Sequence, residues 1–356
     1  MNRLDSFLEL VVHQGGSDLH LVSGDVPRIR INGDLQQVRF RELSTEDVAD
    51  MLGEIMADAQ KEQIERGSSV DFAYQSETVG RYRVNVYRHV CGLAAAMRLI
   101  PSKVPQLSDL GLPATIQTAI EVPKGLILVT GPTGSGKSTT LAGMIDHVSR
   151  LRSGHIITIE DPIEFVHEFR KSLITQREVG THAPSVSEAL RATLREDPDV
   201  ILVGEMRDLE TISLALTAAE TGTQVFATLH TNGAVRSIDR IVNVFPPRRQ
   251  DQIRAVLAES LRMVVSQQLV RRADGNGRVA ALEIMINNHA IASMIRSGNS
   301  HKLINAIQAG ARAGMQSLDA VLSDLVRREI ITGEEAYEHA IDRTSFEQYL
   351  FREAAG

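Results

Sequence analysis

The first hundred residues switch between two spacings of apolar positions. Residues 4–12 place apolar side chains three and four positions apart, which predicts an amphipathic helix. Residues 17–22 and 28–31 predict strands, and a capping pattern predicts one helix over about 46–65. Residues 80–100 alternate apolar and polar side chains in two arms, which predicts paired strands. This region is therefore predicted to be a small α+β domain.

A different pattern begins near residue 123. Short apolar runs rich in β-branched residues recur, separated by stretches long enough for helices. The runs lie at 126–130, 156–160, 200–204 and 225–229. Runs that are apolar on both faces are typical of a parallel sheet covered by helices, so they predict an α/β domain. After residue 245 the spacing becomes helical, with helices predicted over 250–269 and around 318–326.

Length and proline positions divide the chain. A chain of 356 residues is long enough for two domains. Prolines interrupt the segment 101–113, and because proline stiffens the chain and removes a hydrogen-bond donor, this segment is predicted to be an interdomain linker. The predicted domains are therefore 1–100 and 114–356, the second ending in a helical part.

Composition narrows the functional classes. Hydrophobic residues make up 43% and charged residues 23%, which are the values of an ordinary globular protein. The net charge of −7 and the absence of Trp argue against nucleic-acid binding, which usually needs a basic surface and stacking side chains. The single cysteine, Cys91, excludes an internal disulfide and a Cys-rich zinc site and fits a reducing cytoplasm. No apolar run has the length of a membrane span and no signal-peptide pattern is present, so no direct membrane insertion is expected.

The strongest chemical signal is a phosphate-binding loop. A G-x-x-x-x-G-K-[ST] sequence follows the run at 126–130 and precedes a segment that predicts a helix. The residues expected to bind the nucleotide are Gly131, Pro132, Thr133, Gly134, Ser135, Gly136, Lys137, Ser138 and the following Thr139. In this setting backbone N–H groups and a helix N-terminus surround phosphate oxygens, Lys137 reaches the β- and γ-phosphates, and the Ser138 hydroxyl can ligate Mg²⁺. The sequence therefore predicts binding of a nucleoside triphosphate.

Acidic residues follow two of the predicted buried strands. Glu160, Asp161 and Glu164 lie at and just beyond the end of one strand, and Glu205 follows another. A solvated surface charge is the alternative for any one of them. Because parallel sheets bind ligands at the carboxyl ends of their strands, Glu160 and Glu205 are expected to hold Mg²⁺, directly or through water. Gly204 stands where a Walker B strand usually ends in an acid, and either Glu164 or Glu205 is expected to activate the attacking water.

A histidine and several arginines complete the candidate set. His230 ends the apolar run at 225–229; a lone His is more often a packed or capping residue, but the strand-end position favours a γ-phosphate sensor. Three arginines of the first predicted domain are candidates as well: Arg81, Arg83 and Arg98. They form either a solvated strand edge or a group that neutralises charge on the triphosphate. Arg207 and Arg240 are weaker candidates, for contacts between subunits.

Together these signatures resemble the secretion ATPase superfamily of bacterial type II/IV systems. Its four motifs stand in order: the Walker A loop 131–138, an Asp box at 158–165, an atypical Walker B at 200–208 and a His box at 226–234. Segments similar to its PilT-like branch, the type IV pilus retraction ATPases, extend from GGSDLHL near the N-terminus to GMQSLD at 314–319. The resemblance covers essentially the whole chain. The chain departs from the branch at 290–297, where the usual RN pair and final acid are replaced.

The resemblance implies a PAS-like N-terminal domain, a RecA-like ATPase domain and a homohexameric ring. It implies a motor that hydrolyses ATP with Mg²⁺ to power pilus retraction and twitching motility. Catalytic roles are expected for Glu164, Glu205, His230, Arg81, Arg83 and Arg98, and metal contacts for Ser138, Glu160 and Glu205. The implied partners are an inner-membrane platform protein of the pilus and a paralogous pilus ATPase, and no nucleic acid. The implied location is the cytoplasm, peripheral to the inner membrane at the pilus base.

Three alternatives stay open at the level of sequence. The change at 290–297 leaves room for an accessory retraction ATPase or a motor of a related type II/IV secretion system. A RecA-like nucleic-acid motor would share the core fold but predicts a basic channel that bears aromatic residues. A catalytically silent scaffold disagrees with the intact Lys137, Ser138, Glu164 and Glu205.

Overall fold

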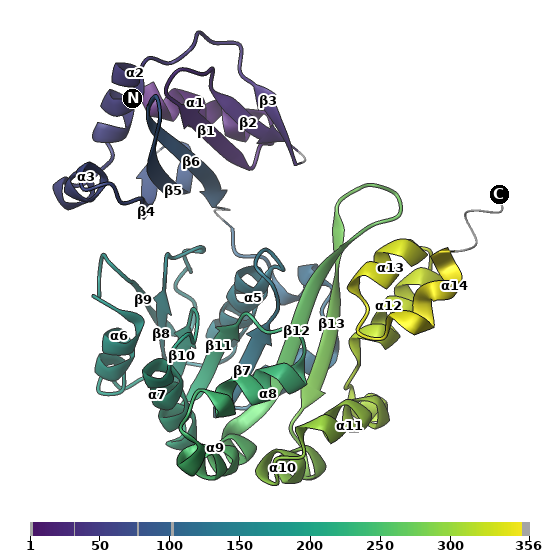
Figure 1. Cartoon of the computed structure of the whole chain (residues 1–356). Helices are drawn as coiled ribbons and strands as arrows, with labels where there is room; N and C mark the ends of the chain where they lie inside the picture. The colour runs from purple at the N-terminus through teal and green to yellow at the C-terminus, as the bar shows by residue number, and fades with distance from the viewer. Residues whose placement is uncertain (1–2, 32, 77, 101–102, 351–356) are drawn as a thin grey trace. The chain divides into compact units, whose positions relative to one another are not determined.

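Two compact units make up the chain in the computed structural model (Figure 1). The structure describes residues 3–31, 33–76, 78–100 and 103–350. Unit 1 comprises Met1–Lys103 and Pro162–Val166, and unit 2 comprises Val104–Asp161 and His167–Gly356. Residues 101 and 102 of the predicted linker lie outside the described ranges, and Leu107, within that segment, belongs to the core of unit 2.

A six-stranded antiparallel sheet forms the centre of unit 1. Its strands are β1 (Asp18–Val22), β2 (Arg28–Ile31), β3 (Asp34–Gln37), β4 (Val70–Ser76), β5 (Gly80–His89) and β6 (Gly92–Ile100). They are ordered β3-β2-β1-β6-β5-β4, so the first strand pairs with the last. The alternation predicted over 80–100 is confirmed: Tyr82, Val84 and Val86 of β5 are buried, and the residues between them are partly exposed.

Helices of unit 1 share one core with this sheet. In the described part of the unit they are α1 (Arg3–His13), α2 (Thr45–Gly53) and α3 (Asp58–Glu65). The predicted amphipathic first helix is confirmed, since Leu4 and Leu8 of α1 are fully buried. The single helix predicted over 46–65 is wrong. The chain becomes extended at Ala57, whose backbone N–H donates to the Gln60 side chain at 2.9 Å, and this cap starts a second helix.

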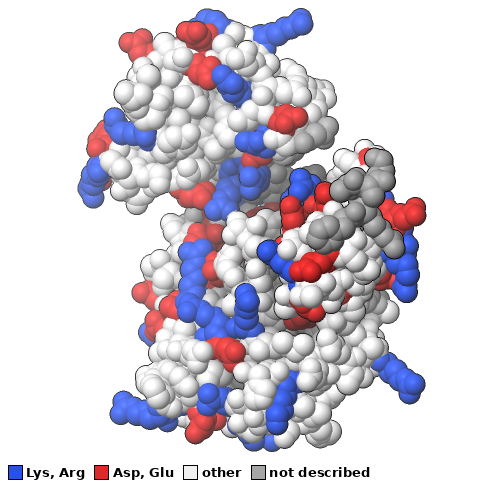
Figure 2. All heavy atoms as spheres, turned by 45° about the vertical axis from the view of Figure 1, so that its right-hand side comes forward, with Lys and Arg blue, Asp and Glu red and all other residues white. Residues whose placement is uncertain are grey.

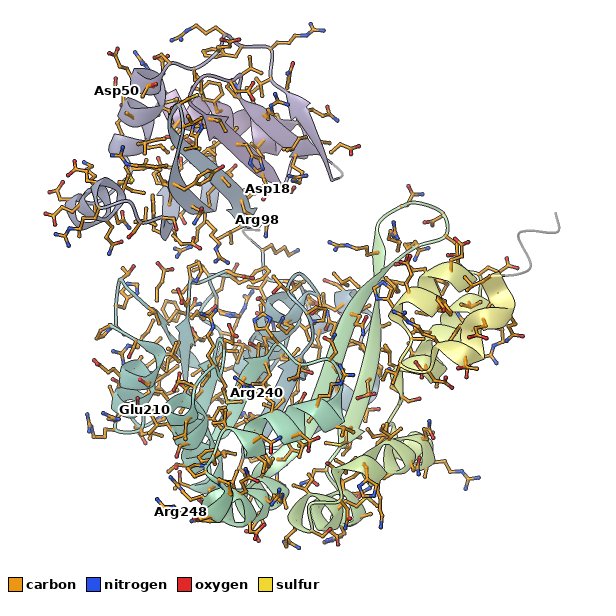
Figure 3. All side chains as sticks on the ribbon, in the orientation of Figure 1. Asp18, Asp50, Arg98, Glu210, Arg240 and Arg248 are labelled. Carbon is orange, nitrogen blue, oxygen red and sulfur yellow. The ribbon has the colours of Figure 1, made fainter. Side chains whose placement is uncertain are left out.

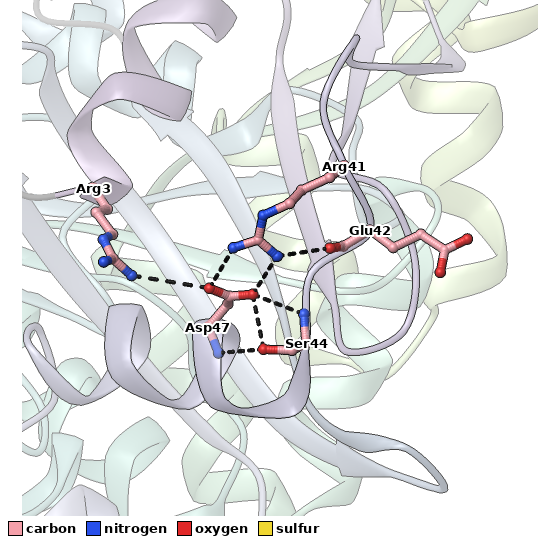
Figure 4. Close-up of polar contacts among 5 residues, drawn as sticks. All are labelled: Arg3, Arg41, Glu42, Ser44 and Asp47. Atoms are coloured by element: carbon pink, nitrogen blue, oxygen red, sulfur yellow. Dashed lines mark hydrogen bonds and ion pairs between the residues drawn. The ribbon is translucent and has the colours of Figure 1, made fainter.

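The start of α2 shows why the chain turns into a helix there. The Asp47 backbone N–H donates to the Ser44 hydroxyl at 3.1 Å, and the Ser44 backbone N–H donates to the Asp47 carboxylate at 3.0 Å (Figure 4). This reciprocal capping box satisfies two otherwise unpaired donors. Arg41 donates two hydrogen bonds to the same carboxylate, at 2.7 and 2.8 Å, and Arg3 lies 3.9 Å from it. The Arg41 guanidinium and the bonds from Ser44 hold the pKa of Asp47 well below its usual range.

A seven-stranded sheet carries unit 2. Its strands are β7 (Gly125–Thr130), β8 (His155–Glu160), β9 (Leu173–Glu178), β10 (Val200–Val203), β11 (Gln224–Leu229), β12 (Leu261–Arg271) and β13 (Arg278–Ile286). They are ordered β13-β12-β7-β11-β10-β8-β9, and all neighbours are parallel except β12 and β13. Each predicted strand run forms a strand, and every residue of β7, β10 and β11 is buried, as parallel strands covered on both faces require.

Helices cover both faces of the unit 2 sheet, which confirms the α/β prediction. One face packs against η1 (Leu107–Leu110), α4 (Ala114–Ile120) and α5 (Lys137–Leu151). The other packs against α6 (Val186–Thr193), α7 (Leu209–Glu220), α8 (Ala234–Asn243), α9 (Pro247–Ser260), α10 (His289–Arg296) and α11 (Leu303–Ala309). Successive side chains of β7 point to opposite faces of the sheet. Ile127 and Val129 pack on the side of α5, whereas Leu126 and Leu128 pack on the side of α6 to α11.

The region after residue 245 departs from the prediction. The helix predicted over 250–269 is wrong beyond Ser260, where α9 ends and β12 begins. The apolar run of β12 is compatible with a helix or a strand, and its pairing with both β7 and β13 decides the outcome. Residues 278–286, which lie between the two predicted helices, form β13. The local spacing of apolar residues does not indicate that a segment pairs with a strand far away in the sequence.

The C-terminal helices form a further core with the β12–β13 hairpin (Figure 1). The helix predicted around 318–326 is confirmed as α12 (Leu318–Arg327). The remaining elements are η2 (Ser300–Lys302), η3 (Gly310–Ala313), α13 (Gly333–His339), η4 (Arg343–Phe346) and α14 (Glu347–Leu350). None of the helices in the described ranges combines the length and the hydropathy needed to cross a bilayer. Figure 2 shows acidic and basic side chains interspersed on the visible surface of each unit.

Candidate functional site

The carboxyl ends of the parallel strands of unit 2 bring several predicted residues to one edge. The phosphate-binding loop follows β7, Glu160 ends β8, Glu205 comes just after β10 and His230 just after β11. Because these four strands are neighbours and run parallel, their ends lie side by side. This is the edge at which doubly wound sheets bind their ligands.

The loop between β7 and α5 has the backbone of an anion-binding turn. Gly131, Gly134 and Gly136 have φ values of 141°, 78° and 84°, which residues with side chains rarely adopt. No atom of the residues that the structure describes lies within 4 Å of a Cβ built on Gly134. The Ser135 hydroxyl is buried and, over the ranges that the structure describes, has no hydrogen-bond partner. Open space beside Gly134 and an unused hydroxyl donor on Ser135 fit a chain of phosphates.

Lys137 begins α5 and folds back over the loop. Its Nζ donates to the carbonyl oxygens of Gly131 and Pro132, each at 2.9 Å, and the residue is 8% exposed. Ser138 follows it in the first turn of the helix. The ammonium, the helix N-terminus and the glycine backbone thus place positive charge and N–H donors around the same small volume.

Gly204, at the position of the usual Walker B acid, is explained by packing against β8. A Cβ built on Gly204 would lie 3.1 Å from the carbonyl oxygen of Ile159 and 3.3 Å from the Cα of Glu160. A side chain there would push β8 away and displace Glu160. The hydroxyl of Thr228 on β11 donates to the Gly204 carbonyl oxygen. Gly204 therefore contacts β11 on one side and β8 on the other. The acid of this motif is therefore carried one residue later, by Glu205.

His230 connects the phosphate-binding loop to Glu205. Its Nε2 lies 3.2 Å from Glu205 Oε1, and its Nδ1 lies 3.4 Å from the Thr133 hydroxyl. Arg207 donates to Glu205 through Nε at 2.6 Å, and Arg240, labelled in Figure 3, donates to the Arg207 carbonyl at 3.2 Å. Three motifs distant in sequence thus meet in one chain of contacts. A carboxylate and an imidazole beside a phosphate loop can orient a water molecule and respond to a terminal phosphate.

The Asp box divides between the two units. Glu160 accepts hydrogen bonds from the Thr158 hydroxyl at 2.7 Å and from Gln176 Nε2 at 3.2 Å, which fix it at the end of β8 in unit 2. Glu164 belongs to the segment assigned to unit 1, and its Oε1 lies 4.0 Å from Arg83 Nη1. Of the two candidate bases, Glu205 is the one in direct contact with His230.

The three arginine candidates of unit 1 gather on one face of its sheet. Arg83 of β5 is the register partner of Arg98 of β6, and Arg81 precedes Arg83 by two residues on the same face. Arg83 donates to Asp71 through Nε at 3.1 Å and Nη2 at 2.7 Å. Arg98 donates to Asp18 at 2.8 Å, and both residues are labelled in Figure 3. The Arg98 side chain is 69% exposed. Their action on a triphosphate stays a prediction.

Two residues that the sequence did not single out hold the His-box loop. Ser266 of β12 and Glu283 of β13 are register partners. The backbone N–H of Gly233 donates to the Ser266 hydroxyl at 2.8 Å, and that of Ala234 donates to Glu283 Oε1 at 2.6 Å. Burial raises the pKa of Glu283, and the bond from Ala234 opposes that rise. An acid inside the apolar run 279–286 is the signal that could have revealed Glu283.

The acidic residues that the structure describes at the carboxyl ends of the unit 2 strands do not form a ready-made metal site. Each could contribute one ligand to a metal ion. Across the described ranges, one group of three has ligand atoms within 4.8 Å of one another, namely Glu335, Glu338 and His339. That group is on α13, where Glu335 already pairs with Arg271 at 3.0 Å. At the phosphate-binding loop, Mg²⁺ would therefore take most of its ligands from phosphate oxygens and water, as it commonly does.

Comparison with known proteins gives a likeness over nearly the full chain. Residues 1–353 match the family described as type II/IV secretion system protein. The chain is 49% identical over 337 residues to the type IV pilus retractation ATPase PilT of Pseudomonas aeruginosa, covering 95% of this chain and 98% of that protein. It is 48% identical over 330 residues to a twitching motility protein of Neisseria gonorrhoeae, covering 91% and 88%. A crystal structure of the pilus retraction motor PilT with bound ADP matches with a TM-score of 0.90 at 43% identity, covering 98% of this chain and 99% of that one.

Proposed function

The chain belongs to the type II/IV secretion system protein family, and we propose that it is an ATP-hydrolysing motor that powers type IV pilus retraction. Retraction disassembles the pilus and so drives twitching motility. The proposal is supported by 49% identity to a protein named as a retraction ATPase, across 98% of that protein's length. The second relative is named for twitching motility, the behaviour that such a motor would produce.

The observation that carries the chemistry is the contact chain from Thr133 through His230 to Glu205 beside the phosphate-binding loop. Loop N–H groups and Lys137 hold the β- and γ-phosphates of ATP. Glu205 orients the attacking water, and His230 responds to the γ-phosphate. Ser138, Glu160 and Glu205 are the proposed protein contacts of Mg²⁺, which supplies positive charge to the phosphate oxygens when bound.

The unit 1 arginines are proposed to act in the assembled ring. Hydrolysis concentrates negative charge on the departing phosphate, and guanidinium groups stabilise such charge through paired N–H donors. Arg81, Arg83 and Arg98 share a sheet face from which such donors can be presented together. Asp71 and Asp18 orient two of these guanidinium groups.

A ring of six copies is the proposed working form. Closed cyclic symmetry lets each copy present the same surfaces to its two neighbours. Light scattering with Mg²⁺ and nucleotide should therefore give six times the 39.0 kDa chain mass. A monomer mass at micromolar concentration under those conditions would contradict the ring.

The proposed partners are a platform protein of the pilus at the inner membrane and, as a further partner, a paralogous pilus ATPase. The proposed location is the cytoplasmic side of the pilus base. An accessory retraction ATPase, or a motor of a related secretion system, is the alternative, because residues 290–297 differ from the usual sequence of the retraction branch.

Expression in a cell that lacks its own retraction ATPase tests the proposal. Fluorescently labelled pili should extend and then shorten again in cells that express this chain, and should stay extended in cells with the empty vector. Restored shortening without any second ATPase identifies the main motor. Shortening that needs a co-expressed paralogue identifies the accessory form, and no shortening in either case rejects the retraction function.

A further inference from the structure

Gln267 lies on β12 directly beside the phosphate-binding loop. β12 runs parallel to β7, and Ser266 is in register with Thr130, the last residue of β7. The next residue along β12 therefore stands beside Gly131, where the loop begins. Gln267 is 4% exposed, and it falls in the stretch whose spacing predicted a helix, so nothing in the sequence linked it to the loop.

Both ends of the Gln267 amide are tied to the loop and to the helix that follows it. Nε2 donates to the backbone carbonyl oxygen of Ser135 at 2.6 Å, and Oε1 accepts from the Thr140 hydroxyl at 2.8 Å. A carbonyl oxygen can only accept, so Ser135 determines which end of the amide faces it. One buried side chain thus joins the loop to the first turn of α5.

The glycines at the two ends of the loop also pack against Gln267. A Cβ built on Gly131 would collide with the backbone carbonyl oxygen of Gln267, and one built on Gly136 would lie 2.8 Å from the side-chain Nε2 of Gln267. The separation of the Gly131 Cβ from the backbone oxygen and that of the Gly136 Cβ from Nε2 are both shorter than van der Waals contact. At Gly136 the requirement for glycine therefore comes from the Gln267 side chain as well as from the positive φ, whereas at Gly131 it comes from the β12 backbone and the positive φ.

We propose that Gln267 is a positioning residue for nucleotide binding, because it holds the peptide between Ser135 and Gly136 with its N–H turned toward the phosphates. In a planar trans peptide the C=O and N–H groups point in opposite directions. Anchoring the Ser135 carbonyl on Gln267 directs the Gly136 N–H away from β12, to the inner side of the loop. Inward N–H groups are what such loops use to bind phosphate oxygens. This inference rests on the proposed function, since it requires the loop to bind a nucleotide.

The test replaces the amide by an apolar side chain of similar length. Gln267→Met leaves the Ser135 carbonyl and the Thr140 hydroxyl without their buried partners, and the loop should reorganise. With Mg²⁺ present, we expect the Kd of ADP and that of a non-hydrolysable ATP analogue to rise together, each by about ten-fold. The rise is shared because both nucleotides contain the phosphates that this loop holds. The KM for ATP should rise by a similar factor, with kcat within about three-fold of wild type.

Two further variants separate positioning from general stability. Gln268→Met changes the next residue of β12, whose Oε1 lies 2.7 Å from His339 Nδ1 on α13, and should leave both Kd values within about two-fold of wild type. Thr140→Val removes one of the two ties. It should raise Kd less than Gln267→Met does. It should add little to Gln267→Met in the double variant, since Gln267→Met already removes both ties.

Unchanged affinity in a folded Gln267→Met protein would overturn the inference, as would an equal loss in Gln268→Met. Should Gln267→Met fail to fold, Thr140→Val alone decides: unchanged affinity overturns the inference, and a loss of affinity supports it. A wild-type protein that binds neither nucleotide would instead reject the ATPase function itself. The two kinds of failure are therefore distinguishable.

Discussion

Lys137→Ala is expected to lower kcat/KM for ATP by about 10³-fold, equal to about 4 kcal/mol of transition-state stabilisation. The Lys137 ammonium donates to the carbonyl oxygens of Gly131 and Pro132. These bonds hold it over the loop, in position to contact the β- and γ-phosphates. Alanine removes the charge just where negative charge accumulates as the phosphate leaves. Phosphate release under excess Mg²⁺-ATP measures the effect.

Lys124→Ala is the matched control for this prediction. It removes the same charge from an exposed residue just before β7, at the strand end opposite the phosphate-binding loop. Its hydrolysis rate should equal that of wild type, and thermal unfolding should show that both variants are folded. Similar rates in Lys137→Ala and Lys124→Ala would remove the loop from the mechanism.

Glu205→Gln is expected to separate binding from turnover. Glutamine keeps the size of the side chain and an acceptor for His230 or Arg207, so ATP affinity should stay within about three-fold of wild type. The carboxylate that polarises the water is gone, so kcat should fall by about 10²- to 10³-fold, or about 3–4 kcal/mol. Nucleotide titration and single-turnover hydrolysis measure the two quantities independently.

Two glutamates provide the comparisons for Glu205→Gln. Glu210, labelled in Figure 3, lies on α7 and pairs with Arg191. Glu210→Gln should hydrolyse ATP at the wild-type rate. Glu164→Gln tests the second candidate base. A normal rate in Glu205→Gln together with a strong loss in Glu164→Gln would transfer the role of base to Glu164.

The fold could be predicted wherever local spacing and final environment agree. β7, β10 and β11 are buried on both faces, and their uninterrupted apolar runs express that burial directly. β12 was predicted to be helical because its apolar run fits the spacing of a helix as well as that of a strand. Its strand conformation depends on pairing with β7, which lies more than a hundred residues earlier in the chain. The break between α2 and α3 was missed since Ala57 is not a usual N-cap residue.

The site could be predicted as far as its residues belong to motifs. Motif order and the parallel sheet together predict that the phosphate-binding loop, Glu205 and His230 share one edge, and the structure places them in contact. Supporting residues are a different case. Ser266, Gln267 and Glu283 are ordinary residues in a hairpin that the spacing did not predict, so their approach to the loops becomes visible only in three dimensions.

ATP hydrolysis at this strand edge is proposed to drive pilus retraction. The sharpest test of this coupling measures how fast pili shorten in cells that express variants with different hydrolysis rates. Wild type, Gln267→Met and Glu205→Gln would be expressed at equal levels in cells lacking their retraction ATPase, and labelled pili followed one at a time. Shortening speed should follow the hydrolysis rate of each purified protein at cellular ATP, so that it is fastest for wild type and close to zero for Glu205→Gln. Pili that shorten at wild-type speed with Glu205→Gln, while the purified variant turns over at least about 10²-fold more slowly, would contradict that coupling.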